Sequence, residues 1–114
     1  EEDIRKVLKI RLLAEGYEVI EAFNGEEGVK TAYQQKPSLI LMDIMMPVLD
    51  GISATRKIKN HLETASIPVV MLTAKTDNAS EIESLDAGAD DYICKPFDQN
   101  KILARIRMLL KRHS

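Results

Sequence analysis

Three polar residues directly follow short apolar runs, and together their side chains could handle an anionic, oxygen-rich ligand. Asp43 follows "LILM", Thr73 follows "VVML", and Lys95 follows "YIC". A carboxylate can act as a nucleophile or a metal ligand, a hydroxyl can donate a hydrogen bond, and an ammonium attracts phosphate or carboxylate. A single strand-end aspartate is more often a cap or turn residue, but three such groups at successive strand ends favour a binding site.

Alternating helical and strand-like patterns must position these residues. Apolar residues recur at helical spacing, or run continuously as in a buried strand, with short polar or glycine-containing turns between them. We expect helices over 4–16, 24–36, 51–62, 79–88 and 98–110, and strands over 17–22, 39–42, 67–73 and 91–94. The alternation indicates a parallel sheet with helices on both faces. In such sheets ligands bind outside the carboxyl ends of the strands, where Asp43, Thr73 and Lys95 would meet.

Several local signals refine this pattern. Gly16 and Gly88 are placed to end helices, and Asp98 to cap the last helix. The run 39–42 is typical of a strand covered on both faces. We interpret Asp50 and the glycine after it as a turn and helix start, and Leu62 as part of the buried stripe of the helix that follows.

Composition places the chain among single-domain globular proteins. It has 114 residues, of which 45% are hydrophobic and 30% charged, and a net charge of −2. These values do not suggest a chain-wide nucleic-acid or membrane surface, and no signal peptide or spanning run is visible, which favours the cytoplasm. The one cysteine, Cys94, is expected to be a small buried residue rather than a reactive thiol.

The motifs that carry these residues resemble one known family. "LILMDIMMPVLDG", "IPVVMLTA" and "GADDYICKPF" occur in the order and at the separations found in receiver domains of two-component response regulators. The resemblance covers residues 1–114 and is strongest to receivers of the winged-helix transcription-factor class. It implies a flavodoxin-like α/β three-layer sandwich, with a parallel sheet in the order 2-1-3-4-5.

The resemblance also implies a mechanism. Asp43 would accept a phosphoryl group from a histidine kinase or phosphotransfer protein. Mg²⁺ would be bound by Asp43 and by the backbone carbonyl of Met45. Lys95 would pair with the phosphoryl group, the Thr73 hydroxyl would move to donate to it, and Tyr92 would swing into the space that Thr73 leaves. The domain would catalyse at most its own phosphorylation and dephosphorylation.

The implied readout is a changed surface at the fourth helix, last strand and last helix, through which a homodimer could form. Arg105, Arg107 and Lys111 could make ion pairs across subunits with acids such as Asp90 and Asp91. Intramolecular pairs or solvated charges fit the sequence equally well. No DNA-binding segment is visible, so nucleic-acid binding by this domain and a membrane interaction are not expected.

The sequence departs from the family at its first residues. Family members usually begin with an apolar strand that ends in two adjacent acids, which hold the magnesium. Here "EEDIRKVLKI" begins just after that pair, and neither Glu1 nor Glu2 is assigned its role. We expect the natural protein to have this strand. The alternative is a deletion, with a strand borrowed from a neighbour or a rearranged sheet. Metal binding by residues 1–114 alone should be weak.

Two other functions remain open from the sequence. The missing acidic pair motivates a receiver-like interaction module that takes no phosphate. A phosphatase of the haloacid dehalogenase type also uses a strand-end aspartate with a Thr or Ser and a Lys. Those enzymes carry a second acid two residues after the nucleophile, where this chain has Met45, so that function is disfavoured.

Overall fold

The computed structural model describes residues 2–45, 48–73, 78–94 and 97–112. In chain order its elements are α1 (Glu2–Ala14), α2 (Gly25–Gln35), β1 (Ile40–Asp43), α3 (Gly51–Lys59), β2 (Val69–Thr73), α4 (Asn78–Asp86), β3 (Asp91–Cys94) and α5 (Gln99–Arg112). None of the helices in this part of the chain is long and apolar enough to cross a membrane.

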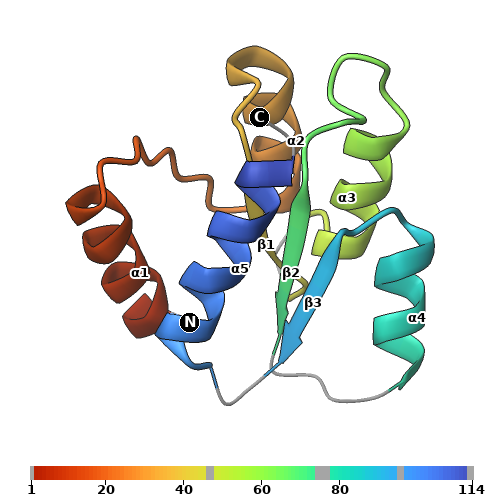
Figure 1. Ribbon diagram of the computed structural model, residues 1–114. Coiled ribbons are helices and arrows are strands. Elements are labelled where there is room, and N and C mark those ends of the chain that lie inside the picture. Colours follow the sequence, from red (N-terminus) through yellow and green to blue (C-terminus); the bar gives the residue numbers. More distant parts are fainter. Residues whose placement is uncertain (1, 46–47, 74–77, 95–96, 113–114) are drawn as a thin grey trace.

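The three strands form one parallel sheet in the order β1-β2-β3. α1 and α5 lie on one face, and α2 and α3 lie on the other with α4 beside α3 (Figure 1). The strands run in the same direction, so their carboxyl ends share one edge of the sheet. This α/β/α layering confirms the predicted fold class.

Two apolar clusters fill the two sides of the sheet. One joins β1 and β2 to α2 and α3, and the other joins β2 and β3 to α5 and to Leu8 of α1. β2 lies between them and has no exposed apolar side chain, since four of its five residues are buried and Leu72 is half-buried. The continuous apolar run of the central strand therefore reflects burial on both faces.

The helix boundaries follow the expected local signals. The Asn24 and Asp50 side chains accept hydrogen bonds from backbone N–H groups in the first turns of α2 and α3, both at 2.8 Å. Asp98 does the same for α5, accepting from the Asn100 N–H at 2.9 Å. Gly16 and Gly88 follow α1 and α4 with φ of 91° and 106°, a backbone conformation that favours glycine.

Two predictions about the strand and helix around the site were wrong in part. α3 ends at Lys59, three residues before Leu62, and the Leu62 side chain is 92% exposed. A turn over residues 60–66 follows the helix, and its first four residues, 60–63, are exposed. In β1 only Met42 is buried and its neighbours are half-buried, so this strand is less covered than its sequence suggested.

The predicted strand over residues 17–22 does not form, and this segment has no regular secondary structure. A strand is stabilised by a hydrogen-bonded neighbour, and no other described segment lies in position to provide one. The sheet therefore contains the equivalent of the last three strands of the expected 2-1-3-4-5 order. The three strands have not rearranged to compensate.

Candidate functional site

Asp43 and Thr73 lie on adjacent strands at the carboxyl edge of the sheet. Asp43 is the last residue of β1 and pairs in register with Leu72 of β2, so Thr73 lies one residue further along. The Asp43 residue is half-buried and Thr73 is buried. Two of the three predicted site residues are therefore diagonal neighbours at the edge where ligands of open α/β sheets bind.

The alternation of side chains along the strands limits where a shared ligand could bind. Thr73 belongs to the face of Met71, whereas Asp43 belongs to the opposite face with Leu41. A group that contacts both must therefore lie over the ends of the strands rather than against either face. A position between two neighbouring strand ends suits a small anion rather than a large planar ligand.

The backbone after Asp43 turns sharply and is fixed by its own carboxylate. Oδ1 of Asp43 accepts a hydrogen bond from the Met45 N–H at 2.9 Å. Ile44 is buried in the core between them, with 4% of its surface exposed, and its N–H donates to Leu72 O at 3.3 Å. The residues on both sides of the carboxylate are thus held by the sheet and by its own side chain.

Gly51 allows α3 to begin against this turn. A Cβ atom at this position would lie 2.1 Å from the carbonyl oxygen of Asp43, and the Gly51 N–H donates to Ile44 O at 3.0 Å. Only glycine permits such a close approach of two backbone segments. The sequence signalled a turn and helix start here, but not this packing of the helix on Asp43.

Asp50 is a helix cap. Its carboxylate accepts from both the backbone N–H and the hydroxyl of Ser53, at 2.8 and 2.9 Å. The backbone hydrogen bond from Ser53 is the largest influence on the Asp50 carboxyl and lowers its pKa. This acid stabilises the start of α3, as the sequence predicted.

Val48 is a strained residue in the same loop. Its φ is 69°, which is unfavourable for a β-branched side chain, and the side chain is 76% exposed. Strained backbone is often found at functional sites. A valine gives no sequence signal of positive φ, so this feature was not foreseen.

Tyr92 lies on the same sheet face as Thr73. It pairs with Met71 in the register of β2 and β3, and Thr73 pairs with Cys94 two residues on. Tyr92 is half-buried and packs against the cluster that contains Met71. Cys94 is a free thiol. It is half-buried, whereas the sequence analysis expected it to be fully buried.

Part of the predicted site lies outside the described residues. Lys95, the residue that directly follows β3, belongs to this part, as do residues 46–47 and 74–77. Met45, whose carbonyl was a predicted metal ligand, is described and 64% exposed. Among the described residues, no group of three or more His, Cys, Asp or Glu side chains could hold a metal ion.

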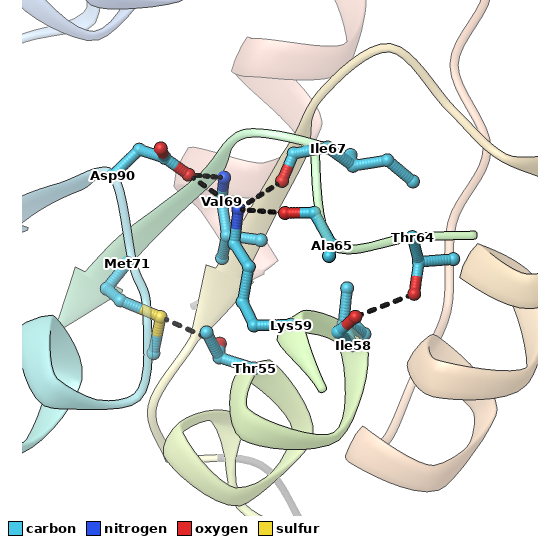
Figure 2. Close-up of polar contacts among 9 residues, drawn as sticks. All are labelled: Thr55, Ile58, Lys59, Thr64, Ala65, Ile67, Val69, Met71 and Asp90. Carbon is cyan, nitrogen blue, oxygen red and sulfur yellow. Dashed lines mark hydrogen bonds and ion pairs between the residues drawn. The ribbon is translucent and has the colours of Figure 1, made fainter. Parts of the chain in front are cut away.

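A polar cluster at the opposite, amino end of β2 was missed by the sequence analysis. Figure 2 shows Lys59 pointing into the turn before β2, where its Nζ donates to Ala65 O at 3.2 Å and to Ile67 O at 2.6 Å. The same ammonium pairs with Asp90 Oδ2 at 3.0 Å, and that oxygen also accepts from the Val69 N–H at 2.8 Å. This cluster fixes the start of β2 relative to α3 and β3. The only sequence signal for this cluster was the position of Lys59 next to the buried face of α3.

Four of the charges considered for a dimer interface form ion pairs within the chain. Arg105 of α5 pairs with Asp91 of β3, and Arg107 pairs with Glu15 at 3.0 Å. Asp90 is the partner of Lys59. Within the single chain these residues therefore adopt the intramolecular pairs that the sequence left open.

Comparisons with known proteins agree on one family. The sequence profile of the response regulator receiver domain matches residues 1–107. The transcriptional regulatory protein SrrA of Staphylococcus aureus is 40% identical over 112 residues, which are 98% of this chain and 45% of SrrA. The chain thus spans about half the length of the curated relatives it matches.

Solved structures show the same fold. A CheY-like receiver domain from Methanospirillum hungatei superposes with a TM-score of 0.91 at 29% identity, covering 99% of this chain and 89% of that one. The receiver domain of the sensor histidine kinase PA1611 from Pseudomonas aeruginosa has a TM-score of 0.87 at 32% identity, covering 97% and 91%. That structure holds a magnesium ion in its active site cleft.

These matches identify the fold as flavodoxin-like and CheY-like. The family profile matches nearly the whole chain, and a relative of the same family aligns along almost all of it. This chain belongs to the response regulator receiver domains of two-component signalling.

Proposed function

We propose that this domain is a signalling switch in which Asp43 accepts a phosphoryl group from a histidine kinase or phosphotransfer protein. A carboxylate oxygen of Asp43 attacks the phosphorus of a phosphohistidine, and a P–O bond forms as the P–N bond breaks. The imidazole nitrogen leaves with the bonding electron pair. The observation that carries the proposal is that Asp43 and Thr73 end two adjacent strands at the carboxyl edge of a receiver-domain sheet.

The surroundings of Asp43 suit this role. Its backbone is held by the Gly51 contact and its side chain by the Met45 N–H, so the nucleophile is positioned before the donor arrives. The Thr73 hydroxyl would donate to a phosphoryl oxygen from the next strand. Lys95, which follows Cys94 in the chain, would supply a positive charge for the same group.

The donor atoms near Asp43 fit Mg²⁺ in part. A carboxylate and an exposed backbone carbonyl are oxygen ligands, and Mg²⁺ commonly takes one or two carboxylates and keeps several waters. Asp43 and the Met45 carbonyl would hold the ion. When bound, it would neutralise charge on the phosphoryl oxygens. With two protein ligands, residues 1–114 should bind it weakly.

Thr73 and Tyr92 would carry the change away from Asp43. They share one sheet face, and Tyr92 belongs to β3, between α4 and α5. Movement of Thr73 toward the phosphoryl group would free space for the Tyr92 ring. The output would be an altered surface on α4, β3 and α5, where Ile82, Leu85 and Met108 already expose apolar side chains.

The proposal includes the partners expected from the sequence. The phosphodonor is a cytoplasmic histidine kinase or phosphotransfer protein, and a homodimer through α4, β3 and α5 is one form of output. Since Arg105 and Arg107 are paired within the chain, such a dimer would depend mainly on apolar contacts or would require these pairs to be exchanged. Binding of nucleic acid by this domain is not part of the proposal.

The proposal is tested by incubating the domain with acetyl phosphate and Mg²⁺ and measuring its intact mass. We expect one phosphate-sized increase that disappears when Mg²⁺ is chelated. The variant Asp43→Asn should show no increase. The matched variant Asp50→Asn, which changes a capping acid of the same loop, should still be phosphorylated.

The outcomes separate the functions considered. Failure of the unchanged domain to gain mass at high Mg²⁺ concentration would favour the interaction module that takes no phosphate. An increase that persists in Asp43→Asn would place the modification on another residue and contradict the proposal. Steady turnover of a generic phosphate ester would support a phosphatase instead.

A further inference from the structure

A buried hydrogen bond joins α3 to β2. The Thr55 hydroxyl donates to the thioether sulfur of Met71 at 3.3 Å, and neither residue has any exposed surface. Figure 2 shows the sulfur directed from the strand toward the helix. A hydroxyl is costly to bury without a partner, so the free energy of burial favours this contact. The Met71 side chain is therefore held toward α3.

Met71 adjoins both of the proposed switch residues. It precedes Thr73 by two positions in β2, so the two side chains lie on the same face of the sheet. Met71 also pairs in register with Tyr92 of β3, which packs against the cluster that contains Met71. Paired residues of adjacent strands are about 4.8 Å apart, and residues two apart in one strand about 6.6 Å. The conformation of Met71 therefore affects the space available to the Tyr92 ring.

A methionine without a restraint would compete with Tyr92 for this space. Its side chain has three rotatable bonds and readily fills irregular gaps in a core. If Thr73 moves toward a phosphoryl group, the space that it leaves lies next to Met71 as well as next to Tyr92. The hydrogen bond from Thr55 holds the sulfur toward α3 and opposes the entry of Met71 into that space.

We propose that Thr55 is a positioning residue, which restrains Met71 and thereby keeps the space next to Thr73 available to the Tyr92 ring. The inference rests on the proposed function, because it concerns the movement of Tyr92 that would follow phosphorylation of Asp43. Thr55 acts through Met71. Its loss should therefore reduce the response of Tyr92 and leave phosphorylation itself unchanged.

Three variants test this role. Thr55→Val has nearly the same shape as the natural residue but lacks the hydroxyl, and Thr55→Ser keeps the hydroxyl. Thr64→Val is the matched control, because the Thr64 hydroxyl is also completely buried but donates to Ile58 O at 2.6 Å, within the same helix–turn segment rather than to β2. Urea unfolding shows that each variant is folded before the comparison.

The first measurement follows the unphosphorylated domain by NMR. Contacts of the Met71 methyl group with α3 and with the Tyr92 ring are compared through their nuclear Overhauser effects. In Thr55→Val we expect the ratio of helix-directed to other conformers of Met71 to fall by about fivefold, as for the loss of one neutral hydrogen bond. Contacts with Tyr92 should strengthen accordingly. Thr55→Ser and Thr64→Val should leave both sets of contacts unchanged.

The second measurement repeats the comparison after incubation with acetyl phosphate and Mg²⁺. Intact mass should show the same extent of phosphorylation in the unchanged domain and in all three variants. We expect the change in the Tyr92 ring signals on phosphorylation to be about twofold or more smaller in Thr55→Val, because Met71 competes for the same space. Thr55→Ser and Thr64→Val should respond as the unchanged domain does.

Three results would overturn the inference. Met71 keeps its conformers in Thr55→Val, or Thr64→Val changes Met71 and Tyr92 as much as Thr55→Val does, or phosphorylated Thr55→Val shows a full Tyr92 response. Failure of the unchanged domain to gain phosphate would contradict the proposed function instead. The first measurement would then still decide whether Thr55 restrains Met71.

Discussion

The two sides of the sheet are built differently. On the side of α3, β2 and β3, residues such as Ile58, Val69 and Met71 are completely buried. On the side of α1 and residues 17–22, the apolar side chains of Ile10 and Phe23 are 67% and 60% exposed. One side is held by a close-packed core, and the other leaves more apolar surface exposed.

On the side of α1 and residues 17–22, polar surface contacts connect these elements to each other and to α5. Arg107 of α5 donates twice to Glu15 just after α1, Arg11 donates to Asn100 at 2.9 Å, and Lys9 pairs with Glu21 at 2.9 Å. Surface contacts of this kind are individually weak and are screened by salt. The difference teaches that the predicted site depends on the well-packed side, whereas α1 and residues 17–22 are attached more loosely.

The largest expected effect is a cavity on the packed side. Ile58→Ala removes a fully buried side chain between α3 and the sheet, and should lower the free energy of unfolding by about 3 kcal/mol. Urea unfolding measures this. Leu62→Ala, three residues beyond the end of α3 and fully solvated, is the control and should change stability by less than about 0.5 kcal/mol. Equal losses would mean that α3 does not anchor the packed side.

A smaller loss is expected when the polar cluster at the amino end of β2 is broken. Asp90→Asn leaves the Lys59 ammonium without its carboxylate, although the Lys59 side chain is only 14% exposed. The cost should be about 2 kcal/mol, as for a hydrogen bond to a charged group. Glu63→Gln breaks the solvent-exposed pair with Lys36 and should cost less than about 0.5 kcal/mol. If Asp90→Asn and Glu63→Gln lower the free energy of unfolding equally, the cluster would contribute no more than a surface ion pair.

On the side of α1 we expect this helix to loosen in acid before β2 does. The hydrogen bond from Arg107 lowers the pKa of Glu15 below its ordinary value, and that from Lys9 lowers the pKa of Glu21. A lowered pKa in the folded state gives stability that is present above the unfolded pKa of about 4.3 and is lost as pH falls through the folded pKa. Amide protection in α1 should therefore fall between about pH 5 and about pH 3 while β2 stays protected.

Arg107→Gln is the control for this pH dependence. It removes the partner of Glu15, so α1 should already be less protected at neutral pH and should respond less to acid. Simultaneous loss of protection in α1 and β2 would contradict the difference between the two sides.

The smallest effect is expected at Ile10. Its side chain is 67% exposed on α1, so Ile10→Thr should change the free energy of unfolding by less than about 0.5 kcal/mol. A loss comparable with that of Ile58→Ala would show that α1 is packed in solution against a surface that covers Ile10.

The sequence predicted best what local signals determine. The ends of β1 and β2 at Asp43 and Thr73, the caps at Asp50 and Asp98, and the parallel order of the strands were expected from short patterns and are confirmed. Each depends on residues within a few positions or on the general geometry of βα units.

Features that depend on distant partners were not predictable in the same way. Residues 17–22 have a strand-like pattern, but no described strand lies beside them. A sequence pattern alone cannot provide the backbone hydrogen bonds that a neighbouring strand would make. Lys59 has a pattern typical of a solvated helix end, yet it is enclosed by the turn before β2 and by Asp90. Val48 has a positive φ, although β-branched residues disfavour this backbone conformation. In all three cases tertiary context decided the outcome.

The close contact at Gly51 gives α3 a mechanical significance. The first residue of this helix touches the carbonyl of Asp43, and its last residue, Lys59, is bonded to Asp90 just before β3. A helix of this length is a stiff rod of about 13 Å. If Asp43 accepts a phosphoryl group as proposed, a small tilt imposed there would be transmitted to the opposite edge of the sheet, so α3 would form a second route of communication beside the proposed movement of Tyr92.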